Sequence, residues 1–499
     1  MRNSVIELMR ISPVADQLAT LFHDAGHELY LVGGSVRDAL LGRLAEERAG
    51  QAGQAERAGQ AGAAQSEDRG KPEDLDFTTD ARPEQIMDLV RGWADAVWET
   101  GIEFGTVSLR KNGTQLEITT FRADSYDRVG RHPDVVFGNS ITDDLMRRDF
   151  TVNAMAIELG AKTFVDPFGG LEALARGELD TPAPPEESFA DDPLRMLRAA
   201  RFVSHLGFTV HQRVFTAMTE MAGEIERISA ERVQGELTKL MLGDQPRRGI
   251  ELMTDSGLAE YVLPEVPGMR LAIDEHHQHK DVYEHSLTVL DQAIDLETKH
   301  EPASGPDLVL RLAALLHDIG KPDTRKFEPG GGVSFHHHEV VGARMARKRL
   351  RKLRYSKEVI SDVSQLVYLH LRFHGYGKGE WTDSAVRRYV TDAGHLLTRL
   401  HKLVRADCTT RNKRKAASLQ RNYDDLEERI ARIKAEEDLA KVRPDLDGNE
   451  IMAILGLEPG PLVGKAWQHL KNVRLDRGPL DREEAIAELH RWAEEQGIR

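Results

Sequence analysis

The chain lacks the features of a disulfide-stabilised, membrane-embedded or secreted protein. Cys408 is the only cysteine among 499 residues, which excludes an intramolecular disulfide and fits a reducing compartment. No apolar run approaches the roughly 20 residues that a membrane-spanning helix needs. The first residues, Met1 to Ser4, do not begin a signal peptide with its apolar segment. We therefore expect a cytoplasmic protein without a membrane anchor.

The chain also lacks a positive net charge. It has 67 Lys and Arg against 82 Asp and Glu, a formal charge of −15, so its overall field does not attract nucleic acids. Each of two local basic runs is either a solvated helix face or a strip that grips RNA phosphates. The first run contains Arg344, Arg347, Lys348, Arg349, Arg351, Lys352 and Arg354, and the second contains Arg411, Lys413, Arg414 and Lys415.

What is present indicates a soluble globular chain of several domains. Hydrophobic residues make up 40% of the chain and charged residues 30%, and 499 residues suffice for about three or four domains. The stretch 45–72 repeats Ala, Gly, Gln and Glu and contains little that could build a core, so we expect a disordered insert there. The fold class that we expect is α+β, with a small mixed β-sheet in an N-terminal head and helices almost throughout the rest. The expected parts are a head at 1–158, a helical neck at 159–270, a metal domain at 271–415 and a helical tail at 416–499.

A glycine turn joins the first expected strand, residues 29–32, to a helix. Gly33, Gly34 and Ser35 stand between the apolar strand and the helix that contains Arg37. Such a turn lets backbone N–H groups approach a phosphate closely, and the dipole of the helix favours the negative charge. On its own, however, a Gly-Gly-Ser sequence is usually only a turn.

Two carboxylates alternate with a leucine on the strand that follows the insert. Asp74 and Asp76 project from one face of this strand, because side chains at positions i and i+2 share a face. They repel each other unless a cation lies between them, and hard oxygen ligands suit Mg²⁺ that is shared with a substrate phosphate. A phosphate-binding turn followed by metal-binding carboxylates indicates nucleotidyl transfer, the attack of a hydroxyl on a nucleoside triphosphate. Further on, Asn112 and Gly113 predict a hairpin turn between two strands, 105–109 and 115–122. Glu117, on the second of these strands, is either a third carboxylate near the metal or an exposed strand residue.

Two later segments carry residues suited to holding a nucleotide. Arg148, Asp149 and Asn153 combine phosphate donors with groups that can bind sugar hydroxyls, although a surface Arg–Asp pair is the simpler interpretation. A further helix is expected to start with Asp192 at its cap and Pro193 at its first helical position. Asp192 and Arg195 share a face, and Asp192 either only caps this helix or contacts a base. A carboxylate accepts from the exocyclic amine of cytosine or adenine, and a guanidinium donates to the neighbouring ring nitrogen. Such a pair selects C and A without a template.

The order and residues of these segments resemble the bacterial class II CCA-adding enzymes and poly(A) polymerases. The resemblance rests on 33–38, 74–76, 147–156 and 191–202, and on 229–237, which is similar to the family's neck element. It implies that Asp74 and Asp76 are catalytic and bind Mg²⁺, and that neck, body and tail hold the acceptor arm of tRNA. The nucleotide-binding residues that it implies are Gly33, Gly34, Ser35, Arg37, Arg148, Asp149, Asn153, Asp192, Arg195 and Arg198. One departure is Asp191, where the family often has Glu.

A second group of residues, between 276 and 407, carries a different chemistry. Imidazoles and carboxylates from several helices can converge on a divalent cation. The sequence His-Asp-Ile-Gly-Lys at 317–321, with histidines before and after it, resembles the HD phosphohydrolase superfamily. The resemblance implies a divalent transition metal of unspecified identity, held by His285, His317, Asp318 and Asp407, with His338 and His370 as further ligands or phosphate contacts. His336 and His337 compete with His338 for its place.

The sequence thus predicts a tRNA nucleotidyltransferase that adds C, C and A to the tRNA 3′ end from CTP and ATP. A phosphatase or phosphodiesterase activity accompanies it if the HD centre is active. A poly(A) polymerase or A-only adding enzyme is the first alternative, and a loop at 126–138, within a candidate lid at 122–139, favours a capacity to add A. The second alternative is a metal phosphohydrolase whose head only binds RNA.

Overall fold

The computed structural model describes residues 13–42, 74–99, 101–123, 136–138, 140–270, 281–329, 332–373, 376, 381–408, 413–436 and 444–498. They form two compact units. Unit 1 comprises Met1–Ile228 with Asp255–Leu258, and unit 2 comprises Ser229–Thr254 with Ala259–Arg499. The expected insert at 45–72 and most of the candidate lid lie outside the described residues. The four-part division of the chain stays a prediction.

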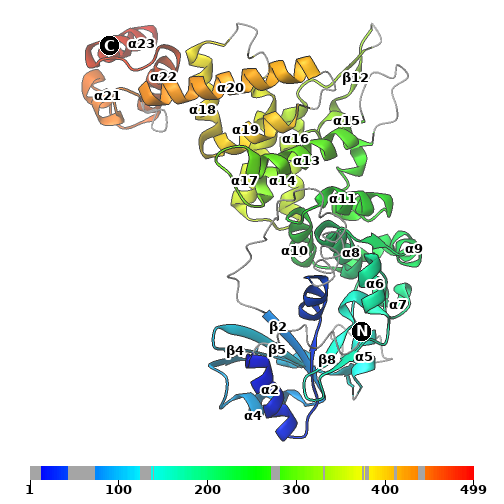
Figure 1. The fold of residues 1–499 in the computed structure, drawn as a ribbon. Helices are drawn as coiled ribbons and strands as arrows, with labels where there is room; N and C mark the ends of the chain where they lie inside the picture. The colour runs from blue at the N-terminus through cyan, green and yellow to red at the C-terminus, as the bar shows by residue number, and fades with distance from the viewer. Residues whose placement is uncertain are drawn as a thin grey trace, which may run out of the picture. The chain divides into compact units, whose positions relative to one another are not determined.

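Unit 1 is built on a seven-stranded mixed sheet with the strand order β3-β4-β5-β2-β1-β8-β9 (Figure 1). The pair β2 and β5 is parallel and the other neighbours are antiparallel. The small mixed sheet expected for the head is therefore confirmed. Its strands are β1 (Leu29–Val32), β2 (Asp74–Thr79), β3 (Ala96–Trp98), β4 (Thr106–Lys111), β5 (Thr114–Thr120), β8 (Ala156–Glu158) and β9 (Thr163–Val165).

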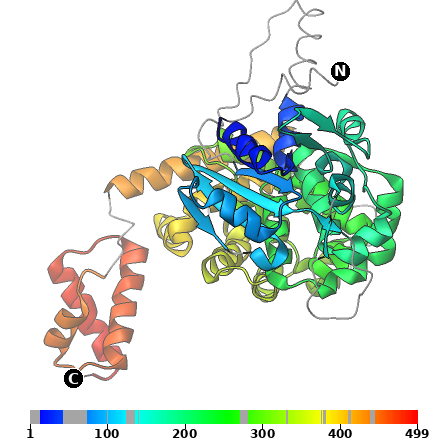
Figure 2. The same ribbon diagram turned by 90° about the horizontal axis from the view of Figure 1, so that it is seen from below.

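The alternation of side chains along β2 separates the core face of the sheet from the face that carries the carboxylates. Leu75 and Phe77 are buried, whereas Asp76 between them is exposed, so Asp76 lies on the opposite face from these two. The helices α2 (Pro13–Asp24) and α4 (Pro83–Val90) lie on one face of the sheet (Figure 2). A tight turn at Asn112 and Gly113, both with positive φ, joins β4 to β5 as the sequence predicts.

Short helices and small two-stranded pairs complete unit 1. The helix α8 (Leu194–Leu206) starts one residue later than the sequence predicts, because Pro193 takes the cap position instead of the first helical position. Asp192 nevertheless stabilises this end, since its Oδ1 accepts from the backbone N–H of Leu194 at 3.2 Å. The short helices and paired strands of unit 1 outside the seven-stranded sheet are β6 (Arg122–Ala123), β7 (Val136–Phe137), α5 (Ile141–Met146), η2 (Thr151–Asn153), α6 (Gly170–Arg176), β10 (Glu178–Leu179), α7 (Pro185–Asp191), α8 (Leu194–Leu206), β11 (Thr209–Val210), α9 (Gln212–Met221), η1 (Ile102–Phe104) and η3 (Ala222–Arg227).

The described part of unit 2 is helical apart from the hairpin of β12 (Lys326–Phe327) and β13 (Val333–Ser334). Within the described residues, no helix is both long and apolar enough to cross a lipid bilayer. Its helices are α10 (Ala230–Met241), α11 (Pro246–Asp255), α12 (Ala259–Val262), α13 (Val282–Lys299), α14 (Leu308–Leu316), α15 (Lys321–Thr324), α16 (His338–Lys352), α17 (Lys357–Leu369), α18 (Asp383–Ala393), α19 (Leu397–Ala406), α20 (Lys413–Glu436), α21 (Gly448–Leu455), α22 (Pro461–Arg477) and α23 (Arg482–Glu495), with the short turns η4 (Pro267–Met269), η5 (His370–Phe373) and η6 (Gly394–Leu396).

A buried ion pair joins three of these helices. Arg311 on α14 donates to Glu297 on α13, with Nη2 and Oε2 2.7 Å apart. The same guanidinium donates from Nη1 to the carbonyl oxygens of Met241 and Gly243, at the end of α10. Because both side chains are buried, replacing only one of them would leave an unpaired buried charge and strongly destabilise the fold. The last three helices, α21 to α23, have a separate core that includes Leu470.

Candidate active site and metal centre

The glycine turn brings two of the expected active-site residues together. Gly33 has a φ of +76°, and a Cβ added there would lie 3.4 Å from Nη1 of Arg148 and 3.4 Å from Oδ2 of Asp76. A residue other than glycine would be strained because of the positive φ, and its Cβ would touch both side chains. The helix after the turn starts at residue 34, so the turn, a carboxylate and a guanidinium meet at its N-terminus.

The two carboxylates expected to bind Mg²⁺ lie on β2, and the open candidate Glu117 lies on the adjacent parallel strand β5. Asp76 on β2 is in register with Glu117 on β5, and both side chains are exposed. Glu117 accepts from Oγ of Ser108 at 3.5 Å. Asp74 begins β2, but its side chain lies outside the described part of the structure. A set of donors made only of carboxylate oxygens suits Mg²⁺, so Glu117 fits the third position that the sequence left open.

A chain of hydrogen bonds connects four of the expected nucleotide-binding residues. The Asp149 carboxylate accepts from Nδ2 of Asn153 at 2.9 Å and from Nη2 and Nε of Arg198 at 2.6 and 2.8 Å. Asn153 in turn accepts from Nη1 of Arg37 at 2.7 Å. Burial works against ionisation of Asp149, but the charge of Arg198 and the hydrogen bonds hold its pKa below the usual value. The oxygens of Asp149 and Asn153 thus position two arginines, and a contact with the sugar stays a prediction.

A cavity of about 260 Å³ lies beside this network. Arg148 donates from Nη2 to Oδ2 of Asp144 at 3.3 Å, and the backbone N–H of Arg122 donates to Oδ1 of Asp144 at 3.3 Å. Four guanidinium groups around one carboxylate make this cavity suitable for a polyanion such as a triphosphate. It is lined by Thr119, Arg122, Asp144, Arg147, Arg148 and Arg195. Sequence reasoning missed Arg122, Asp144 and Arg147, although the Arg-Arg doublet at 147–148 is a visible signal.

Arg195, the expected base contact, is held from two sides. Its Nη1 donates to Oγ of Ser188 at 2.8 Å, and its Nη2 donates to the backbone carbonyl of Arg147. Burial lowers the pKa of Arg195 from its usual value. Asp192 precedes the cap residue Pro193 and accepts from the backbone N–H of Leu194, which is close to the simpler of the two interpretations, and its role in reading a base stays a prediction. Ser188 is a positioning residue that no sequence signal indicated.

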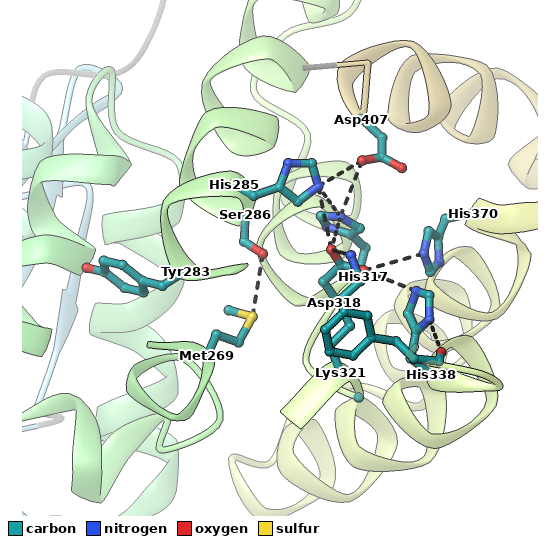
Figure 3. A network of polar contacts seen from close by, with 12 residues as sticks. Met269, Tyr283, His285, Ser286, His317, Asp318, Lys321, His338, His370 and Asp407 are labelled. Carbon is teal, nitrogen blue, oxygen red and sulfur yellow. Dashed lines mark hydrogen bonds and ion pairs between the residues drawn. The ribbon is translucent and has the colours of Figure 1, made fainter. Parts of the chain in front are cut away.

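In unit 2, six expected residues from five segments face one another (Figure 3). Nε2 of His285 lies 2.9 Å from Oδ1 of Asp407, 3.3 Å from Nε2 of His317 and 3.5 Å from Oδ2 of Asp318. On the other side of Asp318, its Oδ1 lies 3.2 Å from Nε2 of His338. The structure thus brings together every residue that the HD resemblance implies. They form two groups of three, His285, His317 and Asp407, and then Asp318, His338 and His370, each with ligand atoms within 4.8 Å of one another.

The orientation of three histidine rings is set by the backbone. Nδ1 of His317 donates to the carbonyl of Ala314 at 2.8 Å, and the same bond, to the residue three positions earlier, occurs in His338 and His370 at 2.7 and 2.6 Å. Because Nδ1 carries the proton, Nε2 keeps a lone pair that a metal can accept. In His338 and His370, buried Nε2 has no hydrogen bond within the described residues. Unsatisfied nitrogens beside carboxylates fit a divalent transition metal.

Of the three consecutive histidines, His338 is the one that lies with the other residues of this centre. His337 has a positive φ of 64°, and its side chain is 82% exposed. His336 is also exposed, whereas His338 begins α16 and is buried. Gly320 explains why this helix comes so close, since a Cβ there would lie 2.2 Å from the carbonyl oxygen of His338.

The head of unit 1 has the architecture and charged groups of a nucleotidyltransferase, and unit 2 contains a His–Asp metal domain. Family models agree with this division: residues 29–180 match the poly A polymerase head domain, and residues 282–432 match the HD domain. Residues 207–269 match the probable RNA and SrmB-binding site of polymerase A. The chain belongs to the family of tRNA nucleotidyltransferases and poly(A) polymerases.

Individual relatives carry two different names. The A-adding tRNA nucleotidyltransferase of Deinococcus radiodurans is 36% identical over 372 residues, which are 73% of this chain and 82% of that protein. The CCA-adding enzyme of Anoxybacillus flavithermus is 28% identical over 94% of this chain and 93% of its own length. For several other CCA-adding enzymes the match spans about half of their length. The fold is shared with the CCA-adding enzyme of Bacillus stearothermophilus in complex with CTP, at a TM-score of 0.65 and 23% identity over 98% of this chain and 99% of that one.

Proposed function

We propose that this protein adds C, C and A to the 3′ end of tRNA, using CTP and ATP without a nucleic-acid template. The observation that carries the proposal is the meeting of Gly33, Asp76 and Arg148 beside the arginine-lined cavity. Backbone N–H groups, a carboxylate and a guanidinium are what the in-line displacement of pyrophosphate from a nucleoside triphosphate requires.

Each group has a distinct task in this reaction. When bound to Asp74 and Asp76, Mg²⁺ would assist ionisation of the attacking hydroxyl and stabilise charge on the leaving oxygen. The N–H groups of the turn at 33–35 and the guanidinium groups around the cavity bind and orient the triphosphate. Arg195, held by Ser188, donates to the acceptor nitrogen of the base. Uracil and guanine present an N–H there, so they are rejected.

A second candidate function, the addition of A alone, is favoured by one comparison. The relative from D. radiodurans, 36% identical, is an A-adding enzyme. The relative from A. flavithermus, which is matched along nearly its whole length, is a CCA-adding enzyme. The same active-site groups serve both activities, so only the products distinguish them.

The products of three tRNA transcripts test the proposal. We expect transcripts that lack the whole CCA end, or end in C or in CC, all to be extended to CCA when CTP and ATP are supplied, as read by sequencing of the 3′ ends. An A-only enzyme would extend only the transcript that ends in CC. Asp76→Ala should abolish incorporation, whereas the control Asp88→Ala, at an exposed position of α4, should leave it unchanged. Incorporation that survives Asp76→Ala would show that the head is assigned wrongly.

We further infer that the HD centre of unit 2 hydrolyses phosphate esters. Its support is the convergence of four histidines and two aspartates, with buried Nε2 atoms that lack hydrogen bonds within the described residues. Hydrolysis of bis(p-nitrophenyl) phosphate should appear in the presence of Ni²⁺, Co²⁺ or Mn²⁺ and should be lost in His317→Ala. The control His336→Ala removes an exposed histidine nearby and should keep the activity. Equal activity in both variants would refute this inference, and Asp76→Ala should leave it unaffected.

A further inference from the structure

The outer face of α16 presents a stripe of positive charge. The buried residues of this helix, among them Gly342, Ala346 and Leu350, recur every four positions and pack towards α17. The opposite face carries exposed cations at spacings of three and four residues, which place them in one narrow row. We call this row the α16 stripe, and it consists of Arg344, Arg347, Lys348, Arg351 and Lys352.

The charges of the α16 stripe are unpaired within the described part of the chain. None of the five side chains has an ion pair or hydrogen bond among the described residues. The neighbouring Arg349 differs, because it lies on another face and donates to both oxygens of Glu265 at 2.9 and 3.0 Å. Exposed cations on other helices are often paired, as Lys299 is with Asp295. The stripe is therefore not part of the ordinary surface network of ion pairs.

The helix itself does not account for this arrangement. Cations near the C-terminus of a helix are favoured by its dipole, but the effect is confined to the last turn. Arg344 and Arg347 lie before that turn. Like charges three and four residues apart repel one another, so the stripe weakens the helix that carries it. In a chain with a net charge of −15, such a concentration fits an anionic partner.

The C-terminal end of α16 is joined to the region that matches the RNA-binding model. Within unit 2, Arg349 contacts Glu265, and Thr238 donates from Oγ1 to the hydroxyl of Tyr355 at 3.1 Å. Glu265 and Thr238 both lie within residues 207–269, the span of that model. The helix that carries the α16 stripe thus packs, through its other face and its C-terminal end, against a segment that is matched to RNA binding.

We propose that the α16 stripe binds the phosphate backbone of the substrate RNA, independently of its sequence. The stripe from Arg344 to Arg351 extends about 10 Å along the helix, enough for guanidinium groups to contact successive phosphates. The inference rests on the proposed function as a tRNA nucleotidyltransferase. It adds an RNA contact on the helix that begins with the HD residue His338.

The test compares two triple variants with the same change in charge. The stripe variant is Arg344→Gln, Arg347→Gln and Arg351→Gln. The control is Arg176→Gln, Lys299→Gln and Arg432→Gln, which removes exposed cations that pair with acidic residues. Binding of a tRNA transcript is measured from low to moderate salt, together with kcat and KM for nucleotide incorporation. A third variant with Lys at the three stripe positions keeps the charge.

We expect the stripe variant to reduce the slope of log K against log salt by about 2 to 3, since each phosphate contact contributes roughly 0.7 to 0.9. Its KM for tRNA should rise at least tenfold at low salt, with kcat at saturating tRNA unchanged. The control and the Lys variant should resemble the wild type. Equal slopes in stripe variant and control, or loss of binding in the Lys variant, would overturn the inference.

Two further readouts distinguish an RNA contact from a structural role of the stripe and from a lipid contact. The thermal midpoint of the stripe variant should not fall, because repulsion within α16 is relieved. The second readout is binding to phosphatidylglycerol vesicles. If the wild type binds them and the stripe variant does not, while the salt slope of tRNA binding is the same in both, the stripe contacts lipid and the RNA contact is refuted. If the wild type binds tRNA through the stripe but incorporates no nucleotide, the proposed function fails and the RNA contact stands.

Discussion

The buried contact between Asp149 and Arg198 offers a quantitative test of how unit 1 holds its arginines. We consider the substitution Asp149→Asn, which preserves the size of the side chain. The Asp149 side chain is 7% exposed and accepts from the N–H of Phe150, from Asn153 and twice from Arg198. The amide removes the negative charge and turns an N–H₂ group towards a donor. The guanidinium of Arg198 then loses its carboxylate partner.

The magnitude follows from how far the pair is shielded from water. Removal of one partner of a buried ion pair costs about 3–5 kcal/mol, whereas an exposed pair contributes about 0–1 kcal/mol. Because the Arg198 side chain is 35% exposed, we expect the free energy of unfolding to fall by about 2–3 kcal/mol. For a unit of this size, that corresponds to a decrease in Tm of roughly 5–10 °C.

Urea unfolding measures the loss, and hydrogen exchange of peptides from η2 and α8 localises it. The matched control is Arg176→Gln, which breaks an exposed pair with Glu172 and should cost less than about 0.5 kcal/mol. A double-mutant cycle with Arg198→Gln should give a coupling above about 1 kcal/mol. If Asp149→Asn costs no more than the control, the pair does not hold the nucleotide-binding arginines and the argument fails.

Three other outcomes are expected. Gly320→Ala should prevent α16 from docking, because its Cβ would lie 2.2 Å from a backbone oxygen, and Tm should fall by more than that of a Gly→Ala change at exposed Gly464. Burial lowers the pKa of His401 to about 4, so the unfolded state binds an extra proton between about pH 6.5 and 4, and stability to urea should fall over that range as pH decreases. Burial would raise the pKa of Glu427, but hydrogen bonds and neighbouring positive charge outweigh it and lower this pKa to about 2. Stability should therefore continue to fall as the pH decreases below about 4.5. Ser188→Ala should free one side of Arg195 and reduce the preference for CTP and ATP over UTP several-fold, as measured by competition in incorporation assays, with little change in Tm.

Elements of the head that depend on short-range chemistry could be predicted from the sequence. Gly33 takes a positive φ between a buried strand and a helix, as the glycine turn indicates, and Asn112 with Gly113 makes the expected hairpin turn. The predicted start of α8 was wrong by one residue, because Pro193 with helical φ and ψ is compatible with both the cap and the first turn. Asp192 still accepts from the first backbone N–H of the helix, that of Leu194.

Contacts between distant segments could not be predicted in the same way. Ser188 and Asp144 position arginines of the cavity, but an isolated Ser or Asp has no distinguishing pattern in the sequence. The choice of His338 over its two neighbours depends on where α16 begins, and three consecutive histidines carry no signal of that boundary. The pair of Glu297 and Arg311 likewise becomes visible only when α13 and α14 are packed together.

The local tethering of three imidazoles has a consequence for how unit 2 acquires its reactivity. Each ring is fixed by the carbonyl three residues earlier in its own segment, so its tautomer is set as soon as that segment folds. The entropy of aligning these rings is lost when the polypeptide folds, and little reorganisation is left for the moment of ion capture. A centre ordered in advance in this way binds its ion more tightly than one whose rings must be aligned on binding.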